Sequence, residues 1–119
     1  MTKNLFVTVF LLAATCAQAQ QMAKIVGIGA SSCTHFNEEI ARSPRTERDY
    51  FAWAQGFMSG VLLRAPLGQD DKLDLAPQSF PLQKQAAFLR EFCSKLPNQS
   101  YADAVLELYL QLRGPESRT

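Results

Sequence analysis

The sequence predicts an all-α protein, a small four-helix bundle with one disulfide that follows a cleaved signal peptide. Apolar residues recur at helical spacing in four segments, and prolines or glycines separate these segments. The most apolar run, residues 50–63, contains no charged side chain. Removal of the N-terminal segment would leave two cysteines, which most simply pair with each other in an exported chain.

The N-terminus has the three parts of a secretory signal peptide. Lys3 precedes an apolar stretch over residues 5–14, and Ala17-Gln18-Ala19 provides a small-x-small cleavage site. This order predicts a signal peptide over residues 1–19 and a periplasmic or secreted mature protein. The alternatives are an N-terminal core helix and a lipoprotein anchored through Cys16.

Charge and length exclude several classes of protein. Cleavage would leave 100 of the 119 residues, enough for one small domain. The mature chain would carry 11 basic and 11 acidic side chains, and this balance argues against a nucleic-acid binder. A membrane-spanning helix needs about 20 apolar residues, and the run over residues 50–63 is shorter.

The first helix is expected after a flexible lead-in over residues 20–32, at the start of a helical domain over residues 33–113. The lone G-x-G within the lead-in lacks the context of a phosphate-binding loop. Ser31 or Ser32 is expected to cap a helix over residues 33–42. Ser43 precedes a proline, which ends that helix.

The second helix, over residues 47–64, is expected to be the buried centre of the bundle, because it is apolar on nearly all sides. Thr46 and Asp49 resemble a capping box at its start. Its core candidates at helical spacing are Tyr50, Trp53 and Phe57. A stripe of small residues, which would let a neighbouring helix approach closely, comprises Ala52, Gly56 and Gly60.

The longest loop, residues 65–79, contains three aspartates: Asp70, Asp71 and Asp74. Calcium binding is an alternative, but the loop lacks the central glycine and the distal glutamate of a calcium loop. We therefore expect a solvated loop, which remains a candidate contact surface because long loops are often functional.

Two more helices complete the bundle. Ser79 is expected to cap the third helix, with Pro81 in its first turn. Ser100 and Asp103 are expected to cap the fourth, over residues 101–112. A polar tail follows over residues 114–119.

Leu106 and Leu110 lie on a flank of the fourth helix that one small core is not expected to cover. They indicate a homodimer or partner contact, with packing against the third helix as the alternative.

The two remaining cysteines, Cys33 and Cys93, are predicted to form a disulfide. Cys93 shares a face of the third helix with core leucines, so the head of the first helix should lie against the end of the third. The bond would close a loop of about 60 residues, worth roughly 4 kcal/mol in the chain-entropy model. The alternatives are free thiols, or a metal site completed by His35.

Catalytic chemistry has little support in the sequence. His35 is the only histidine, and a cysteine in a disulfide is not a nucleophile. Known hydrolase and nucleotide-binding motifs do not occur. We expect no catalytic residue, metal or cofactor. A remote alternative is a small hydrolase that pairs Glu38 with Glu91 or Glu107.

Four sequence segments together resemble small periplasmic proteins with four helices and one disulfide. They are Cys33 with Phe36, WAQGFMSG over residues 53–60, FLREFC over 88–93 with Pro97, and YADAV over 101–105. This outline is similar to that of the HdeA-like acid-stress chaperones. It is also similar to that of the Rap/Tai immunity proteins, which neutralise type VI secretion effectors.

Each resemblance implies a different way of acting by protein contact. HdeA-like proteins are dimers that dissociate in acid and expose apolar surface to unfolding client proteins. An immunity protein binds one dedicated toxin. We therefore expect a non-enzymatic exported protein of the HdeA-like type, with an immunity protein as the alternative.

Overall fold

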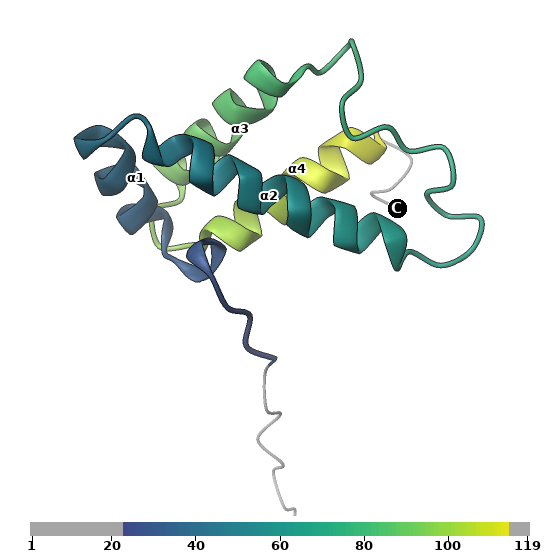
Figure 1. The fold of residues 1–119 in the computed structure, drawn as a ribbon, viewed down its shortest axis with the longest axis horizontal. Helices are drawn as coiled ribbons and strands as arrows, with labels where there is room; N and C mark the ends of the chain where they lie inside the picture. The colour runs from purple at the N-terminus through teal and green to yellow at the C-terminus, as the bar shows by residue number, and fades with distance from the viewer. Residues whose placement is uncertain (1–22, 115–119) are drawn as a thin grey trace, which may run out of the picture.

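The computed structural model describes residues 23–114, and Figure 1 shows their fold. One 3-10 helix precedes four α-helices: η1 (Ile28–Ala30), α1 (Cys33–Arg42), α2 (Thr46–Leu63), α3 (Leu82–Lys95) and α4 (Tyr101–Arg113). These residues contain no β-strand, only an isolated bridge between Ser32 and Ser100. The predicted all-α fold of four helices is confirmed. The predicted signal peptide over residues 1–19 and most of the polar tail lie outside the described residues.

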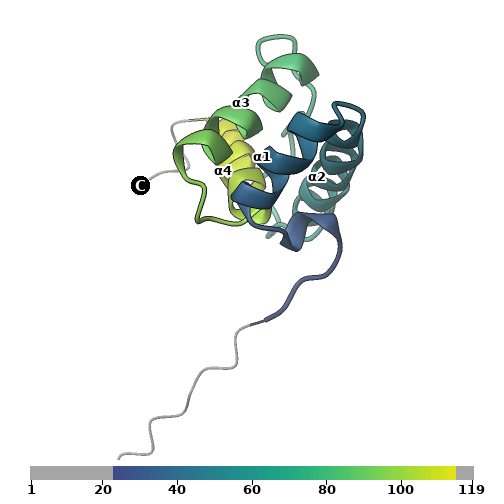
Figure 2. The same cartoon turned by 90° about the vertical axis from the view of Figure 1, so that its left-hand side faces the viewer.

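The helices surround one core. In the view of Figure 2, α1 lies in front, with α2 on one side and α3 on the other. α4 contacts both α2 and α3, and η1 lies against α2 and α4. The long connection over residues 64–81 runs along one side of the molecule, from the end of α2 to the start of α3 (Figure 1).

The starts of α1 and α4 follow the sequence prediction. The Ser32 hydroxyl accepts a hydrogen bond from the His35 backbone N–H at 3.1 Å. At α4, the Ser100 hydroxyl accepts from the Asp103 N–H, and the Asp103 carboxylate accepts from the Ser100 N–H at 2.9 Å. These bonds satisfy backbone donors that a helix start leaves unpaired, so both predicted caps are confirmed.

The starts of α2 and α3 differ from the prediction. Arg45, not Thr46, stands at the N-cap of α2, and no side chain caps it. The Thr46 N–H instead donates to the Ser43 carbonyl, because the turn after α1 leads directly into α2. At α3 the N-cap is Pro81, so Ser79 does not cap this helix.

Aromatic side chains form the centre of the core. The rings of Phe36, Tyr50 and Tyr101 lie 4.8–4.9 Å apart between centroids, so one ring each from α1, α2 and α4 meets the other two. Phe36, Tyr50 and Tyr101 are each only 1% exposed. The buried apolar residues around them include Ala54, Met58, Leu89, Ala104, Val105 and Leu108.

The expectation that α2 is buried on all sides is wrong. Only Tyr50, Ala54 and Met58, which form one face, are buried. Trp53 and Phe57 are partly buried and stack on each other at 4.9 Å. The small-residue stripe lies on the open side: Ala52, Gly56 and Gly60 are exposed. A Cβ atom built on either glycine would meet nothing within 4 Å, so no other helix in the described part of the chain packs against these two glycines.

The segment expected to be a flexible lead-in, residues 20–32, contains a short helix. Residues 28–30 form η1, and Gly29 is buried against the indole ring of Trp53. A Cβ atom at Gly29 would overlap that ring. Glycine is therefore needed here because the backbone packs directly on an aromatic side chain.

Two glycine substitutions should have opposite effects on stability. We expect Gly29→Ala to lower the free energy of unfolding by about 2 kcal/mol, because the new methyl group displaces η1 or Trp53. Gly56→Ala should raise it by about 0.5–1 kcal/mol, because alanine favours an exposed helix and meets no neighbour. Urea unfolding followed by tryptophan fluorescence measures both. A destabilising Gly56→Ala would show that the stripe packs within the chain after all.

Candidate functional site

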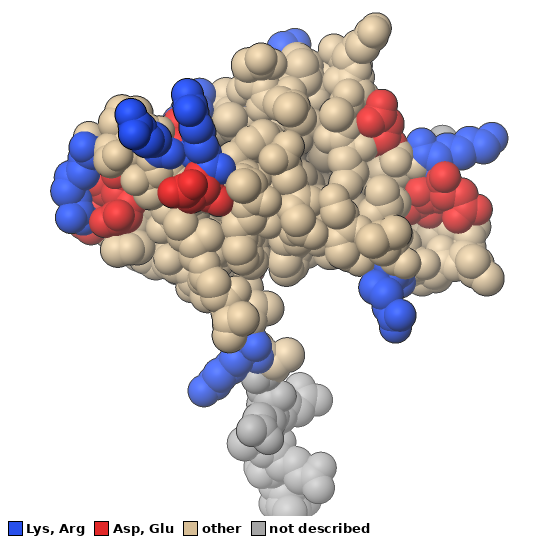
Figure 3. Space-filling model, in the orientation of Figure 1, with Lys and Arg blue, Asp and Glu red and all other residues tan. Residues whose placement is uncertain are grey.

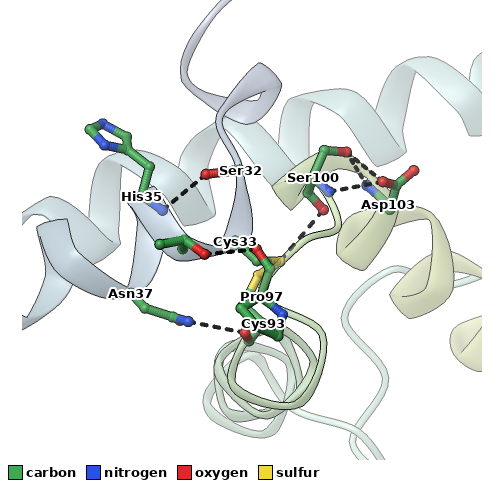
Figure 4. Close-up of a disulfide and its surroundings, with 9 residues drawn as sticks. Ser32, Cys33, His35, Asn37, Cys93, Pro97, Ser100 and Asp103 are labelled. Atoms are coloured by element: carbon green, nitrogen blue, oxygen red, sulfur yellow. Dashed lines mark hydrogen bonds between the residues drawn. A yellow bond between two sulfur atoms is a disulfide. The ribbon is translucent and has the colours of Figure 1, made fainter.

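The disulfide joins the start of α1 to the last turn of α3. Cys33 and Cys93 are bonded, as predicted, and both are fully buried. Asn37 donates through Nδ2 to the Cys93 carbonyl at 3.0 Å (Figure 4). The Thr34 hydroxyl donates to the Pro97 carbonyl at 2.9 Å. This region is a rigid junction rather than a reactive centre, because the sulfur atoms are enclosed and bonded to each other.

Residues considered for metal or hydrolytic chemistry lie apart from this junction. The imidazole of His35 points away from the disulfide (Figure 4). Glu38, Glu91 and Glu107 are exposed, and Lys95 pairs with Glu91 at the surface, which lowers the pKa of that carboxyl. Within residues 23–114, no three side chains of the metal-binding types lie close enough to share an ion.

Asp70 is a structural anchor, not a solvated loop residue as expected. Its Oδ2 accepts a hydrogen bond from the Tyr109 hydroxyl at 2.7 Å, and its Oδ1 accepts from Arg113 Nε at 2.8 Å. The Asp70 side chain is only 6% exposed and that of Arg113 18%. This charge-assisted pair ties the long loop to α4.

The other two aspartates make only local bonds. Asp71 accepts from the Gly68 N–H and Asp74 from the Ala76 N–H, so both shape turns at the surface. Buried Gln85 of α3 holds the far end of the loop, since its Nε2 donates to the Leu75 and Phe80 carbonyls. The loop is therefore fixed at both ends, and the three aspartates do not converge on one site.

Burial and the hydrogen bond to Asp70 raise the pKa of Tyr109 to about 12. The neutral phenol therefore stabilises the folded state fully below the ordinary tyrosine pKa of about 10, and this contribution is lost as the pH rises through 12. We expect the free energy of unfolding to fall across this alkaline range, and to fall less steeply in Tyr109→Phe. Burial raises the pKa of Tyr101 as well, so part of the slope should remain. If the free energy of unfolding depended on pH in the same way in the wild type and in Tyr109→Phe, the alkaline loss of stability would not come from Tyr109.

The predicted contact residues of α4 lie beside a surface hollow. Leu106 is 42% exposed and Leu110 partly so. Both line a depression of about 590 Å³ together with Val61, Ala65 and Pro66 from the end of α2 and the loop. The structure thus brings Leu106, Leu110 and Asp70 to one hollow, with Asp70 buried at its edge.

The open face of α2 is the most extended uncharged surface in Figure 3. Lys, Arg, Asp and Glu gather toward the two ends of this view, and its middle, which α2 crosses, carries none. The exposed residues of α2 in this stretch are Ala52, Gln55, Gly56, Ser59, Gly60 and Leu63. Leu63 is 83% exposed, and Leu67, just beyond the helix, is fully exposed. The sequence had placed this helix in the interior, so its role as a surface was missed.

A shallow groove separates the first halves of α2 and α3, which diverge in Figure 1. We call it the α2–α3 groove; its volume is about 660 Å³, and it is lined by Pro44, Glu47, Arg48, Phe51, Leu82, Gln83, Ala86 and Arg90. Glu47 and Arg90 form an ion pair that connects the two helices. Leu82 is 39% exposed although it stands at helical spacing, two turns before the buried Leu89, so leucine spacing alone does not reveal the groove.

The hollows are open and shallow, and Asp70, which lines one of them, is held by Arg113. No helix within residues 23–114 is both long and apolar enough to cross a membrane. In comparisons with models of protein families, with curated proteins and with solved structures, the chain showed no match.

Proposed function

We propose that this chain is an exported, non-enzymatic protein that acts by binding other proteins, of the HdeA-like stress-chaperone type. The open face of α2 is the observation that carries the proposal. It extends from Ala52 to Leu63 without a charged residue, and no other helix within residues 23–114 covers it. A helix face of this kind is typical of a site that another protein covers.

The tertiary ion pairs support a response to acid. Asp70 joins the loop to α4 through Arg113, and Glu47 joins α2 to α3 through Arg90. In strong acid the acidic side chains of the protein as a whole lose their charge. The whole protein then becomes strongly cationic, which weakens compact and oligomeric states through self-repulsion. Apolar residues under the loop would become accessible to unfolding clients.

The test measures molecular size and apolar-dye binding of the mature, oxidised protein from about pH 7 to about pH 2. We expect a dimer at neutral pH that dissociates reversibly in acid, with new dye binding and suppressed aggregation of an acid-sensitive client. A protein whose size and dye binding stay unchanged over this range would overturn the chaperone proposal.

A pair of variants tests the α2 face itself. Gly56→Glu places a charge in the middle of the exposed face without removing a contact, so the fold should be retained. Its dimerisation or client protection should be lost if this face is used. Gln78→Glu adds the same charge at an exposed position of the loop and serves as the control. Equal behaviour of the two variants would show that binding takes place elsewhere.

An immunity protein that neutralises a type VI secretion effector is the second candidate. The preformed α2–α3 groove favours it, because a dedicated partner is best bound by a surface that exists before binding. Such a protein should bind one partner at neutral pH with its fold unchanged, and its gene should lie beside a toxin gene.

A further inference from the structure

The α2–α3 groove has an apolar floor that the core leaves unfilled. Phe51 is partly buried and packs against the core, and its remaining surface lies in the groove with Ala86 and Leu82. Leu82 is 39% exposed, which leaves much of a large apolar side chain in contact with water. An apolar side chain from another molecule would be stabilised here because it removes these surfaces from water.

The mouth of the groove carries excess positive charge. A second hollow, lined by Pro44, Arg45 and Arg48, adjoins the groove and shares two of its residues. Arg45 and Arg48 form no ion pair with any residue from 23 to 114, whereas Arg90 is paired with Glu47. Asp49, the next acidic residue along α2, lines neither hollow. Two unpaired guanidinium groups thus lie beside an apolar floor.

We propose that the α2–α3 groove binds a segment of a partner protein in which a bulky apolar side chain stands next to one or more carboxylates. The apolar side chain packs on Phe51, Leu82 and Ala86. The carboxylates pair with Arg45 and Arg48, whose planar guanidinium groups can donate two parallel hydrogen bonds. This inference rests on the proposed protein-binding function and adds the chemistry of the segment recognised.

The shape and charge of the groove favour a protein segment over other occupants. The groove is too open to enclose a small molecule on most sides, as ligand sites usually do. The two arginines form a local site rather than the broad basic surface that binds anionic membranes, because the chain as a whole has balanced charge. An amphipathic or extended segment matches both the apolar floor and the charged mouth.

The experiment selects peptides from a displayed random library on the mature, oxidised protein. We expect enriched peptides to combine a large apolar residue with Asp or Glu within a few positions. The dissociation constant of the best peptide should rise about tenfold or more in the double variant Arg45→Ser, Arg48→Ser. Ala86→Gln, which fills the groove with a polar side chain, should weaken binding as well.

Matched controls separate this result from general charge effects and from unfolding. Arg64→Ser with Lys72→Ser removes two exposed cations outside the groove and should leave peptide binding unchanged. Urea unfolding of every variant confirms that the fold is retained. Peptide affinity should also fall with added salt, since the arginines lie at the surface.

Four outcomes would overturn the proposal. The first two are the absence of any enriched peptide and the enrichment of peptides without acidic residues. The third is equal peptide affinity in the wild type and the groove variants. The fourth is an interaction that depends on the arginines but takes place with vesicles of anionic lipid, or with a second copy of this chain, in place of peptides. None of these would affect the proposed function, which the Gly56→Glu variant tests on the open face of α2. Conversely, unchanged client binding in Gly56→Glu together with the expected peptide selection would contradict the use of the α2 face and leave the groove proposal standing.

Discussion

Replacing Cys33 and Cys93 together with serine is expected to lower the free energy of unfolding by about 4 kcal/mol. The bond closes a loop with a sequence separation of 60 residues, and opening it restores conformational freedom to the unfolded chain. For a domain of this size that loss is a large part of the total stability. Urea unfolding of the oxidised wild type and of the double variant, in parallel, gives the difference.

The folded state should nevertheless retain its shape in the double variant. Backbone bonds from Cys33 and Thr34 to the Gln99 and Pro97 carbonyls, at 2.7 and 3.0 Å, do not depend on the sulfur atoms. A reducing agent provides the control, since it should destabilise the wild type and leave the double variant unaffected. If the free energies of unfolding of the wild type and the double variant differed by less than about 1 kcal/mol, the unfolded chain would gain little freedom when the bond is absent.

Asp70→Asn is expected to lower the free energy of unfolding by about 3 kcal/mol. This is the second largest effect predicted, after loss of the disulfide. The change removes the negative charge that faces Arg113 in a site where the two side chains are 6% and 18% exposed, and leaves a mostly buried guanidinium without its counter-charge. The hydrogen bond from the Tyr109 hydroxyl should weaken as well, because its acceptor is no longer charged. Chemical unfolding at neutral pH measures the loss.

Asp71→Asn is the matched control, one residue further along the same loop. Asp71 is exposed and accepts a hydrogen bond only from the Gly68 N–H, which asparagine can also accept. The free energy of unfolding should therefore change by no more than about 0.5 kcal/mol. If both variants lost the same stability, the effect would come from the net charge of the loop. In that case the contacts of Asp70 with α4 would not be its cause.

Local sequence signals predicted the helices well where a cap is made by neighbours in the chain. Ser32 and Ser100 cap α1 and α4 as expected, because the bonds they make reach only three residues ahead. The disulfide was predictable because removal of the predicted signal peptide would leave only two cysteines, which have few alternatives to pairing in an oxidising compartment. The boundaries of α2 were shifted by one residue, since the preceding turn supplies a carbonyl that replaces the expected cap.

The surfaces were less predictable, because they depend on how many neighbours each helix has. The spacing of Tyr50, Met58 and Gly56 is equally compatible with a helix covered on all sides and one covered on a single side. Only the tertiary arrangement leaves Gly56 without a neighbour. The role of Asp70 was hidden for a related reason. Its partner Tyr109 lies 39 residues away, and nothing in a loop without periodicity indicates that contact.

The bridge between Ser32 and Ser100 has a consequence for how the domain opens. The Tyr101 N–H donates to the Ser31 carbonyl at 2.9 Å, and the Cys33 N–H donates to the Gln99 carbonyl, so the first turns of α1 and α4 are paired directly. The first and last helices therefore cannot fray separately. In deuterated water, the amide hydrogens of Cys33 and Tyr101 exchange only when the two helix starts come apart together, which makes them reporters of cooperative opening.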